Sequence, residues 1–150
     1  MADKRSQGAG WSDEEVAAMQ QRAEELKSTK GLKGAAKLAR EYQSCIDAIT
    51  ALEGSDRAIA ERVHEIVTEE APHLTPKTFY GFPAYALDGK VLVFYQPASK
   101  FDTRYGTVSF DEPAQLDDGP MWPISYVVLE VTDEVEQRLR ELVRRAAPAG

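Results

Sequence analysis

The feature that most constrains the fold of this chain is an Asp-Gly pair, Asp88-Gly89, between two runs of apolar residues. Both central residues of a type I′ turn adopt positive φ angles, which Asp and Gly tolerate, so the pair predicts a β-hairpin that joins residues 84–87 to residues 90–96. This hairpin lies within residues 77–110, which hold most of the aromatic side chains of the chain. Aromatic side chains favour strands, so the segment predicts a small antiparallel sheet.

Helical patterns stand on both sides of the predicted sheet. Before it we expect a helix that begins after Ser12, a second over residues 35–52, and a third that ends near Ala71 because a proline follows. After it come a polar loop, a last strand over residues 124–131, and a helix capped by Thr132 or Asp133. Helices segregated from a run of about five antiparallel strands predict an α+β two-layer sandwich, with the helices packed on the sheet.

The chain of 150 residues has the length of a single domain. Residues 1–11 are polar and predict a disordered lead-in. Residues 12–34 predict an accessory helix followed by a linker rich in lysine and glycine, because the apolar stripe of this helix is thin. Residues 35–147 then form the α+β domain.

Charge and hydropathy narrow the classes of function. The formal net charge is −7, which disfavours nucleic-acid binding and favours cations. No apolar run approaches the roughly 20 residues of a membrane helix, so no membrane partner is expected. The first residues lack the apolar core of a secretory signal, and the single cysteine, Cys45, fits a reducing compartment, so a cytoplasmic location is expected.

Two motifs resemble those of a bacterial family. They are the run YGFPAY at residues 80–85 and the run MWP at residues 121–123. Over residues 46–146 the chain resembles the YdhG-like family of the YjbR/CyaY-like, or frataxin-like, superfamily, whose members are largely of unknown function. The resemblance implies a frataxin-like fold and an iron-chaperone-like function, with iron held weakly. The histidine that the family often carries after the loop lysine is absent after Lys100, so no role of that histidine carries over.

The third expected helix carries a candidate metal ridge. Glu61, Glu65 and Glu69 are four residues apart and line one face, with His64 beside them. Carboxylates with an imidazole suit a divalent ion such as ferrous iron, and the resemblance to frataxin-like proteins points the same way. The alternative is a solvated helix face on which the glutamates pair with arginines.

The second candidate is a small-ligand pocket on the aromatic face of the sheet, near an expected bend at residues 81–83. Its members are aromatic, proline and cationic side chains of the strands and adjoining loops: Tyr80, Pro83, Tyr85, Lys100, Arg104, Tyr105 and Trp122. The tyrosines are expected to project together from neighbouring strands, and the cationic tips would favour an anionic ligand. The alternative is that these side chains pack the sheet and that the first helix covers them.

The sequence therefore predicts a small non-enzymatic binding protein. No nucleophile–base pair, zinc signature or phosphate-binding glycine motif is recognisable. The resemblance implies an iron-binding, iron-chaperone-like carrier. Two alternatives stay open: a protein that binds a small anionic ligand on the aromatic sheet face, and a protein-interaction module in which the first helix docks or releases.

Overall fold

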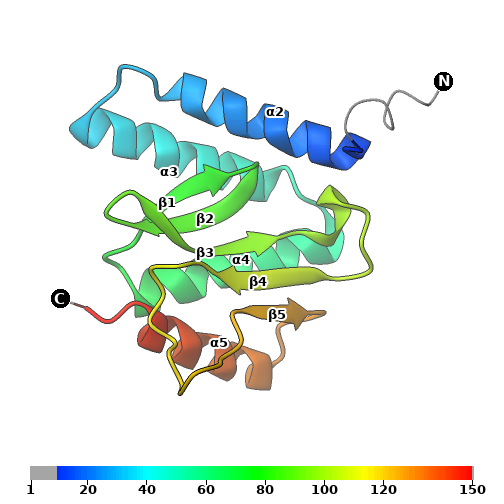
Figure 1. Ribbon diagram of the computed structural model, residues 1–150, viewed down its shortest axis with the longest axis vertical. Helices are drawn as coiled ribbons and strands as arrows, with labels where there is room; N and C mark the ends of the chain where they lie inside the picture. The colour runs from blue at the N-terminus through cyan, green and yellow to red at the C-terminus, as the bar shows by residue number, and fades with distance from the viewer. Residues whose placement is uncertain (1–9, 150) are drawn as a thin grey trace.

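The computed structural model describes residues 10–149. Within this range four α-helices and a five-stranded antiparallel sheet form an α+β fold, with helices packed on the sheet (Figure 1). The elements in chain order are α2 (Asp13–Ser28), α3 (Gly34–Thr50), α4 (Gly54–Glu70), β1 (Thr75–Phe79), β2 (Phe82–Leu87), β3 (Lys90–Gln96), the 3-10 helix η1 (Ala98–Lys100), β4 (Gly106–Phe110), β5 (Ser125–Val128) and α5 (Asp133–Ala146). The lead-in expected over residues 1–11 falls almost entirely outside the described residues. No helix in the described range is long and apolar enough to cross a membrane.

The sheet is a simple meander in which each strand pairs with the next, in the order β1-β2-β3-β4-β5. The predicted hairpin is confirmed: β2 and β3 are antiparallel, and Leu87 pairs with Lys90 across the turn. Asp88 and Gly89 have φ angles of 50° and 85°, as a type I′ turn requires. This local signal therefore determined both the turn and the register beside it.

The bend expected at residues 81–83 is wrong. The chain turns one residue earlier, at Tyr80 and Gly81, whose φ angles are 55° and 82°. Phe79 pairs with Phe82 across this turn, so Phe82 and Pro83 already belong to β2. A tyrosine seldom occupies a left-handed position, because its Cβ crowds the backbone there, so a second tight hairpin was not apparent from these residues.

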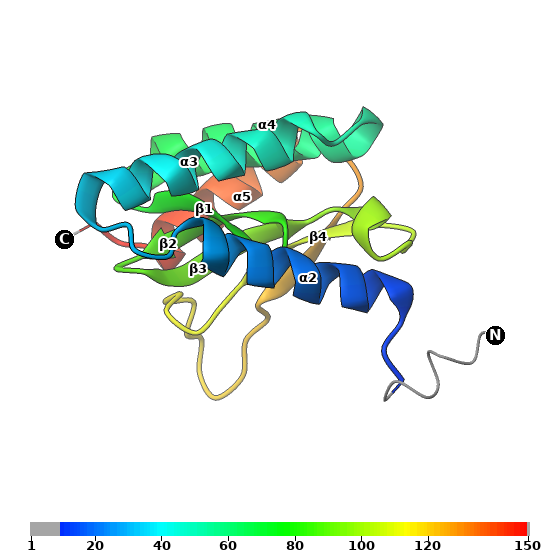
Figure 2. The same cartoon turned by 90° about the horizontal axis from the view of Figure 1, so that it is seen from above.

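α3 and α4 lie over one face of the sheet, and α5 packs beside α4 (Figure 2). Alternate strand residues such as Tyr85, Val93 and Phe110 point into this layer and are at most 2% exposed. They share one continuous core with side chains of the helices, including Ile66 of α4 and Leu139 of α5. Full burial of side chains of this size contributes about 1.5–3 kcal/mol each, so this layer holds the fold together.

α2 stands apart from that layer and runs beside the β1 edge of the sheet (Figures 1 and 2). It begins after Ser12, as predicted, with a capping box: the Glu15 amide donates to Ser12 Oγ at 3.0 Å, and the Ser12 amide donates to Glu15 Oε1 at 2.9 Å. None of the residues Asp13–Ser28, all of which the structure describes, is buried. α2 is thus well capped as a helix but contributes no buried side chain to the core.

Candidate functional site

The carboxylates of the predicted metal ridge form ion pairs with arginines. The ion pairs join Glu61 to Arg57 at 3.0 Å, Glu65 to Arg62, and Glu69 to Arg140 at 2.8 Å. In the part of the chain that the structure describes, no group of three or more His, Cys, Asp or Glu side chains lies close enough to hold a metal ion. The ridge therefore has the arrangement of a solvated, ion-paired helix face.

Two arginines of α5 also join this helix to α4. Arg140 pairs with Glu70 of α4 at 2.9 Å and with Glu136 of its own helix at 2.9 Å, and Arg144 pairs with Glu70 at 2.8 Å. The hydrogen bonds from these arginines lower the pKa of Glu70 and of Glu136 below the usual glutamate value. Acidic side chains of α4 thus hold α5 in place through ion pairs.

His64 faces the core and not the ridge, which corrects the expectation that it lies beside the glutamates. Its Nδ1 atom is 3.0 Å from the Tyr85 hydroxyl of β2. Three residues along a helix is a rotation of about 300°, so His64 is displaced by about 60° from Glu61, toward the sheet. Burial lowers the pKa of His64, which keeps the imidazole neutral near pH 7.

The Tyr85 hydroxyl also meets the single cysteine. Cys45 Sγ of α3 lies 3.9 Å from it, so α3, β2 and α4 are joined by a short polar chain inside the core. Burial raises the pKa of Cys45 to about 11, and burial also raises the pKa of Tyr85. Because the thiolate is the nucleophilic form of cysteine, a thiol with so high a pKa is a poor nucleophile.

The structure does not bring the seven predicted pocket residues together. Tyr85 is 0% exposed and faces the helices, whereas Tyr80 sits in the β1–β2 turn. Tyr105 precedes β4, and its ring packs under the Arg104 guanidinium at 5.0 Å. The expectation of three tyrosines on one face is wrong, because the register directs Tyr85 inward and the turn removes Tyr80 from the strands.

The other predicted pocket residues are equally scattered. Pro83 is fully buried within β2. Trp122 lies in the β4–β5 loop and lines a small cavity of about 260 Å³ with Tyr126 and the α5 residue Leu142. Of the seven, only Lys100 lines the large cleft described below.

The sheet face opposite the helices carries phenylalanines in place of tyrosines. Phe94 pairs with Ala84, the neighbour of Tyr85, and therefore points away from the helix layer. Its ring packs on Phe79 and Phe82, with centroids 5.5 and 6.1 Å away. The Arg22 guanidinium of α2 lies 5.4 Å from the Phe79 ring centroid. This cluster is mainly apolar, with the Tyr80 ring packed edge-on against Phe79 at 4.6 Å, and α2 meets it through a cation–π contact.

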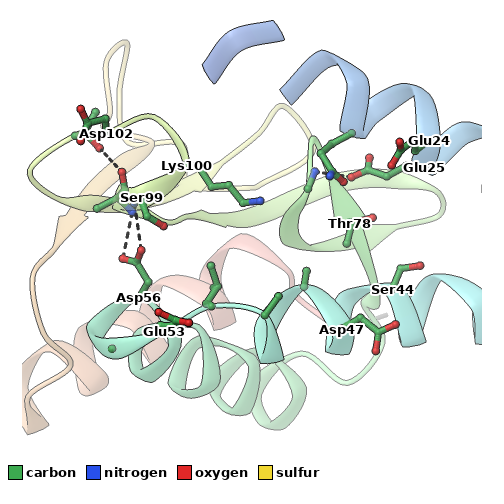
Figure 3. A pocket seen from close by; sticks show the side chains of 18 of the residues that line it. Glu24, Glu25, Ser44, Asp47, Glu53, Asp56, Thr78, Ser99, Lys100 and Asp102 are labelled. Atoms are coloured by element: carbon green, nitrogen blue, oxygen red, sulfur yellow. Dashed lines mark hydrogen bonds between the residues drawn. The ribbon is translucent and has the colours of Figure 1, made fainter. Parts of the chain in front are cut away.

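A large cleft lies between α2, the α3–α4 junction and the loop that contains η1 (Figure 3). Its volume is about 1200 Å³. Its charged lining residues are six carboxylates and one ammonium group: Glu24, Glu25, Asp47, Glu53, Asp56 and Asp102, with Lys100. Sequence reasoning missed this group because its members come from separate segments that only the fold brings together.

Two of the six carboxylates hold the walls of the cleft in place. Glu25 accepts hydrogen bonds from the backbone amides of Tyr80 and Gly81, at 3.1 and 2.5 Å. Asp56 accepts from the amides of Ala98 and Ser99, at 3.3 and 3.1 Å (Figure 3). Among the described residues the remaining four carboxylates form no ion pair. Asp47 accepts a hydrogen bond from Gln43 Nε2 at 2.9 Å, but no cationic side chain within this range neutralises the charge of these four groups.

A buried hydroxyl lies beside this cleft. Tyr95 is 0% exposed, and within residues 10–149 its hydroxyl has no hydrogen-bond partner. Burial and the neighbouring Asp56 carboxylate raise the pKa of Tyr95. A Cβ atom at Gly106 would lie 2.9 Å from this hydroxyl, so glycine at that position leaves the space that the hydroxyl occupies.

Comparisons of the chain with protein-family models, with curated proteins and with solved structures each find no match. The function of the acidic cleft is therefore inferred from its own residues.

Proposed function

We propose that this protein is a non-enzymatic binding protein whose acidic cleft takes up a cationic ligand. The observation that carries the proposal is the charge of the cleft lining, six carboxylates against one ammonium group. A concave site lined by one sign of charge concentrates counter-ions, because the field lines are focused between low-dielectric walls. An anionic ligand would be repelled by the same surface.

The spread of the carboxylates favours an extended cation over a single ion. Glu24 belongs to α2, Asp47 to α3 and Asp102 to the loop after η1, so the charges lie around the cleft and do not converge on one point. A metal ion is held by several donors at about 2.0–2.6 Å, and such a group is absent from residues 10–149. A polyamine, with several ammonium groups along a flexible chain, matches this distribution better.

We also propose the finer assignment that the resemblance implies, a frataxin-like, YdhG-like two-layer sandwich. A meander sheet with α3, α4 and α5 supports it, as do the YGFPAY and MWP runs. An iron-carrier function is the second candidate, favoured by the same acidic cleft. Ferrous iron would then be a weakly held cargo that keeps most of its water ligands and contacts one or two carboxylates.

Isothermal titration calorimetry on three proteins tests the proposal. The ligands are spermidine and, under anaerobic conditions, ferrous iron. The proteins are the wild type, a cleft variant (Glu24→Gln, Asp47→Asn and Glu53→Gln) and a ridge variant (Glu61→Gln, Glu65→Gln and Glu69→Gln). Both variants lose three negative charges, so the ridge variant controls for the change in net charge.

We expect spermidine to bind the wild type and the ridge variant alike, and the cleft variant at least about tenfold more weakly, because three nearby charges are removed. Raised salt should weaken binding, since exposed charges are screened. If iron binds through the cleft and spermidine does not, the iron carrier is the correct candidate. If neither ligand binds the wild type, or if only the ridge variant loses binding, the acidic cleft is not the site.

A further inference from the structure

The attachment of α2 to the rest of the protein is polar. Its apolar side chains Val16, Met19 and Leu26 are 38%, 39% and 57% exposed, so docking buries little of their surface. A cavity of about 60 Å³ remains where α2 approaches α3 and β1. Since burial of apolar area is the main source of packing free energy, the hydrophobic contribution to docking of α2 is small.

One carboxylate makes the strongest contact between α2 and the sheet. Glu25 bridges the amides of Tyr80 and Gly81, and its side chain is 12% exposed. Both donors lie in a left-handed turn, which directs two consecutive N–H groups to the same side. Hydrogen bonds to an ionised acceptor are about twice as strong as neutral ones. We call this contact the Glu25 latch.

The fit of α2 on the turn is close at the latch. A Cβ atom at Gly81 would lie 3.2 Å from Gln21 Cγ, so glycine allows the helix to approach. Arg22 strengthens the same contact, because its guanidinium lies 3.4 Å from Glu25 and 5.9 Å from the Tyr80 ring centroid. The contacts of α2 with the sheet are therefore concentrated at one end of the hairpin.

The connection from α2 to α3 has the conformation of a hinge. Gly31 and Gly34 have φ angles of 83° and 58°, and no atom lies within 4 Å of a Cβ atom built on either. Glycine loses more conformational freedom on folding than other residues, so this linker changes conformation at low cost. Movement about residues 29–34 would carry α2 away from the cleft as one body.

We propose that α2 is a lid over the acidic cleft, closed by the Glu25 latch and opened by rotation about residues 29–34. Gln21, Glu24, Glu25 and Ser28 of α2 line the cleft, so the closed lid supplies two of its six carboxylates. The role of the lid in gating rests on the proposed cation binding. A cation that contacts both walls binds the closed state better, and its binding therefore shifts the population toward closure.

Hydrogen–deuterium exchange of the full chain, measured by mass spectrometry, tests the lid. The variants are Glu25→Gln and Glu24→Gln: each removes one negative charge from the cleft, at neighbouring positions of the same helix, and only the first removes the ionised acceptor and one of the two acceptor oxygens of the latch. We expect Glu25→Gln to speed amide exchange in α2 about tenfold or more, because hydrogen bonds to a charged group are lost. Glu24→Gln should change it less than about twofold, and exchange in α4 should stay constant in both variants.

The lid and the proposed function fail in different ways in this experiment. Equal exchange of α2 in the two variants, or exchange of α2 as slow as that of α4 in all three proteins, overturns the lid. Spermidine should slow exchange in α2 of the wild type and dissociate faster from Glu25→Gln than from Glu24→Gln. If Glu25→Gln alone opens α2 while spermidine neither binds nor slows exchange, the lid stands and cation binding is overturned.

Discussion

The first and last helices that the structure describes, α2 and α5, are attached to the rest of the fold in opposite ways. Both begin with a hydroxyl cap, Ser12 in one and Thr132 in the other. α5 buries Leu139, Val143 and Ala146 in the core and is fastened to α4 by an arginine network, whereas no residue of α2 is buried in the described structure. A helix can thus be well formed by its own sequence and still be weakly attached, and only the attachment decides which element can move.

The two helices should differ most in how much the free energy of unfolding falls when a leucine of each is replaced by alanine. Leu139→Ala in α5 should lower the free energy of unfolding by about 2–5 kcal/mol, because it leaves a cavity in the core. Leu26→Ala in α2, at a side chain that is 57% exposed, should change it by less than about 0.5 kcal/mol. Urea denaturation of both variants measures this. Equal losses would mean that α2 is part of the core.

A second contrast compares the stability lost when the hydroxyl is removed from each of two buried core tyrosines, Tyr85 and Tyr95, of which Tyr95 lies beside the cleft. Tyr85→Phe should cost about 1 kcal/mol, because the variant loses the partner of His64. Tyr95→Phe should be neutral or stabilising, because the hydroxyl it removes has no partner within the described residues. Thermal unfolding of the two variants tests this, and a large loss for Tyr95→Phe would show that its hydroxyl is paired in solution.

Replacing a surface arginine of either helix should have a smaller effect on stability, and the effect should depend on pH. The pKa values of Glu70 and Glu136 are lowered by Arg140 and its neighbours, so their contribution to stability is present above the usual value of 4.5 and is lost as pH falls through the lowered values. Arg140→Gln should therefore flatten the fall of stability that accompanies a fall of pH below 4.5. Arg22→Gln should leave it unchanged. Melting temperatures across this range provide the test, and identical profiles would contradict the comparison.

The local features of the fold could be predicted from the sequence, and the site could not. The Asp88-Gly89 turn and the start of a helix after Ser12 depend on residues close together in the chain, and both were confirmed. The direction of His64 depends on where the sheet lies relative to α4, so spacing along one helix was not enough. The cleft depends on tertiary structure entirely, because Glu24 and Asp102 are far apart in sequence and yet line the same cleft.

A lid requires that α2 opens while α5 and the core stay folded, and native-state hydrogen exchange in rising urea distinguishes such an opening from global unfolding. We predict that the α2 amides exchange through an opening whose free energy is far below that of global unfolding and is nearly independent of urea, while the α5 amides exchange only with global unfolding. If the two helices share one opening free energy and one urea dependence, α2 unfolds only with the core and does not act as a lid.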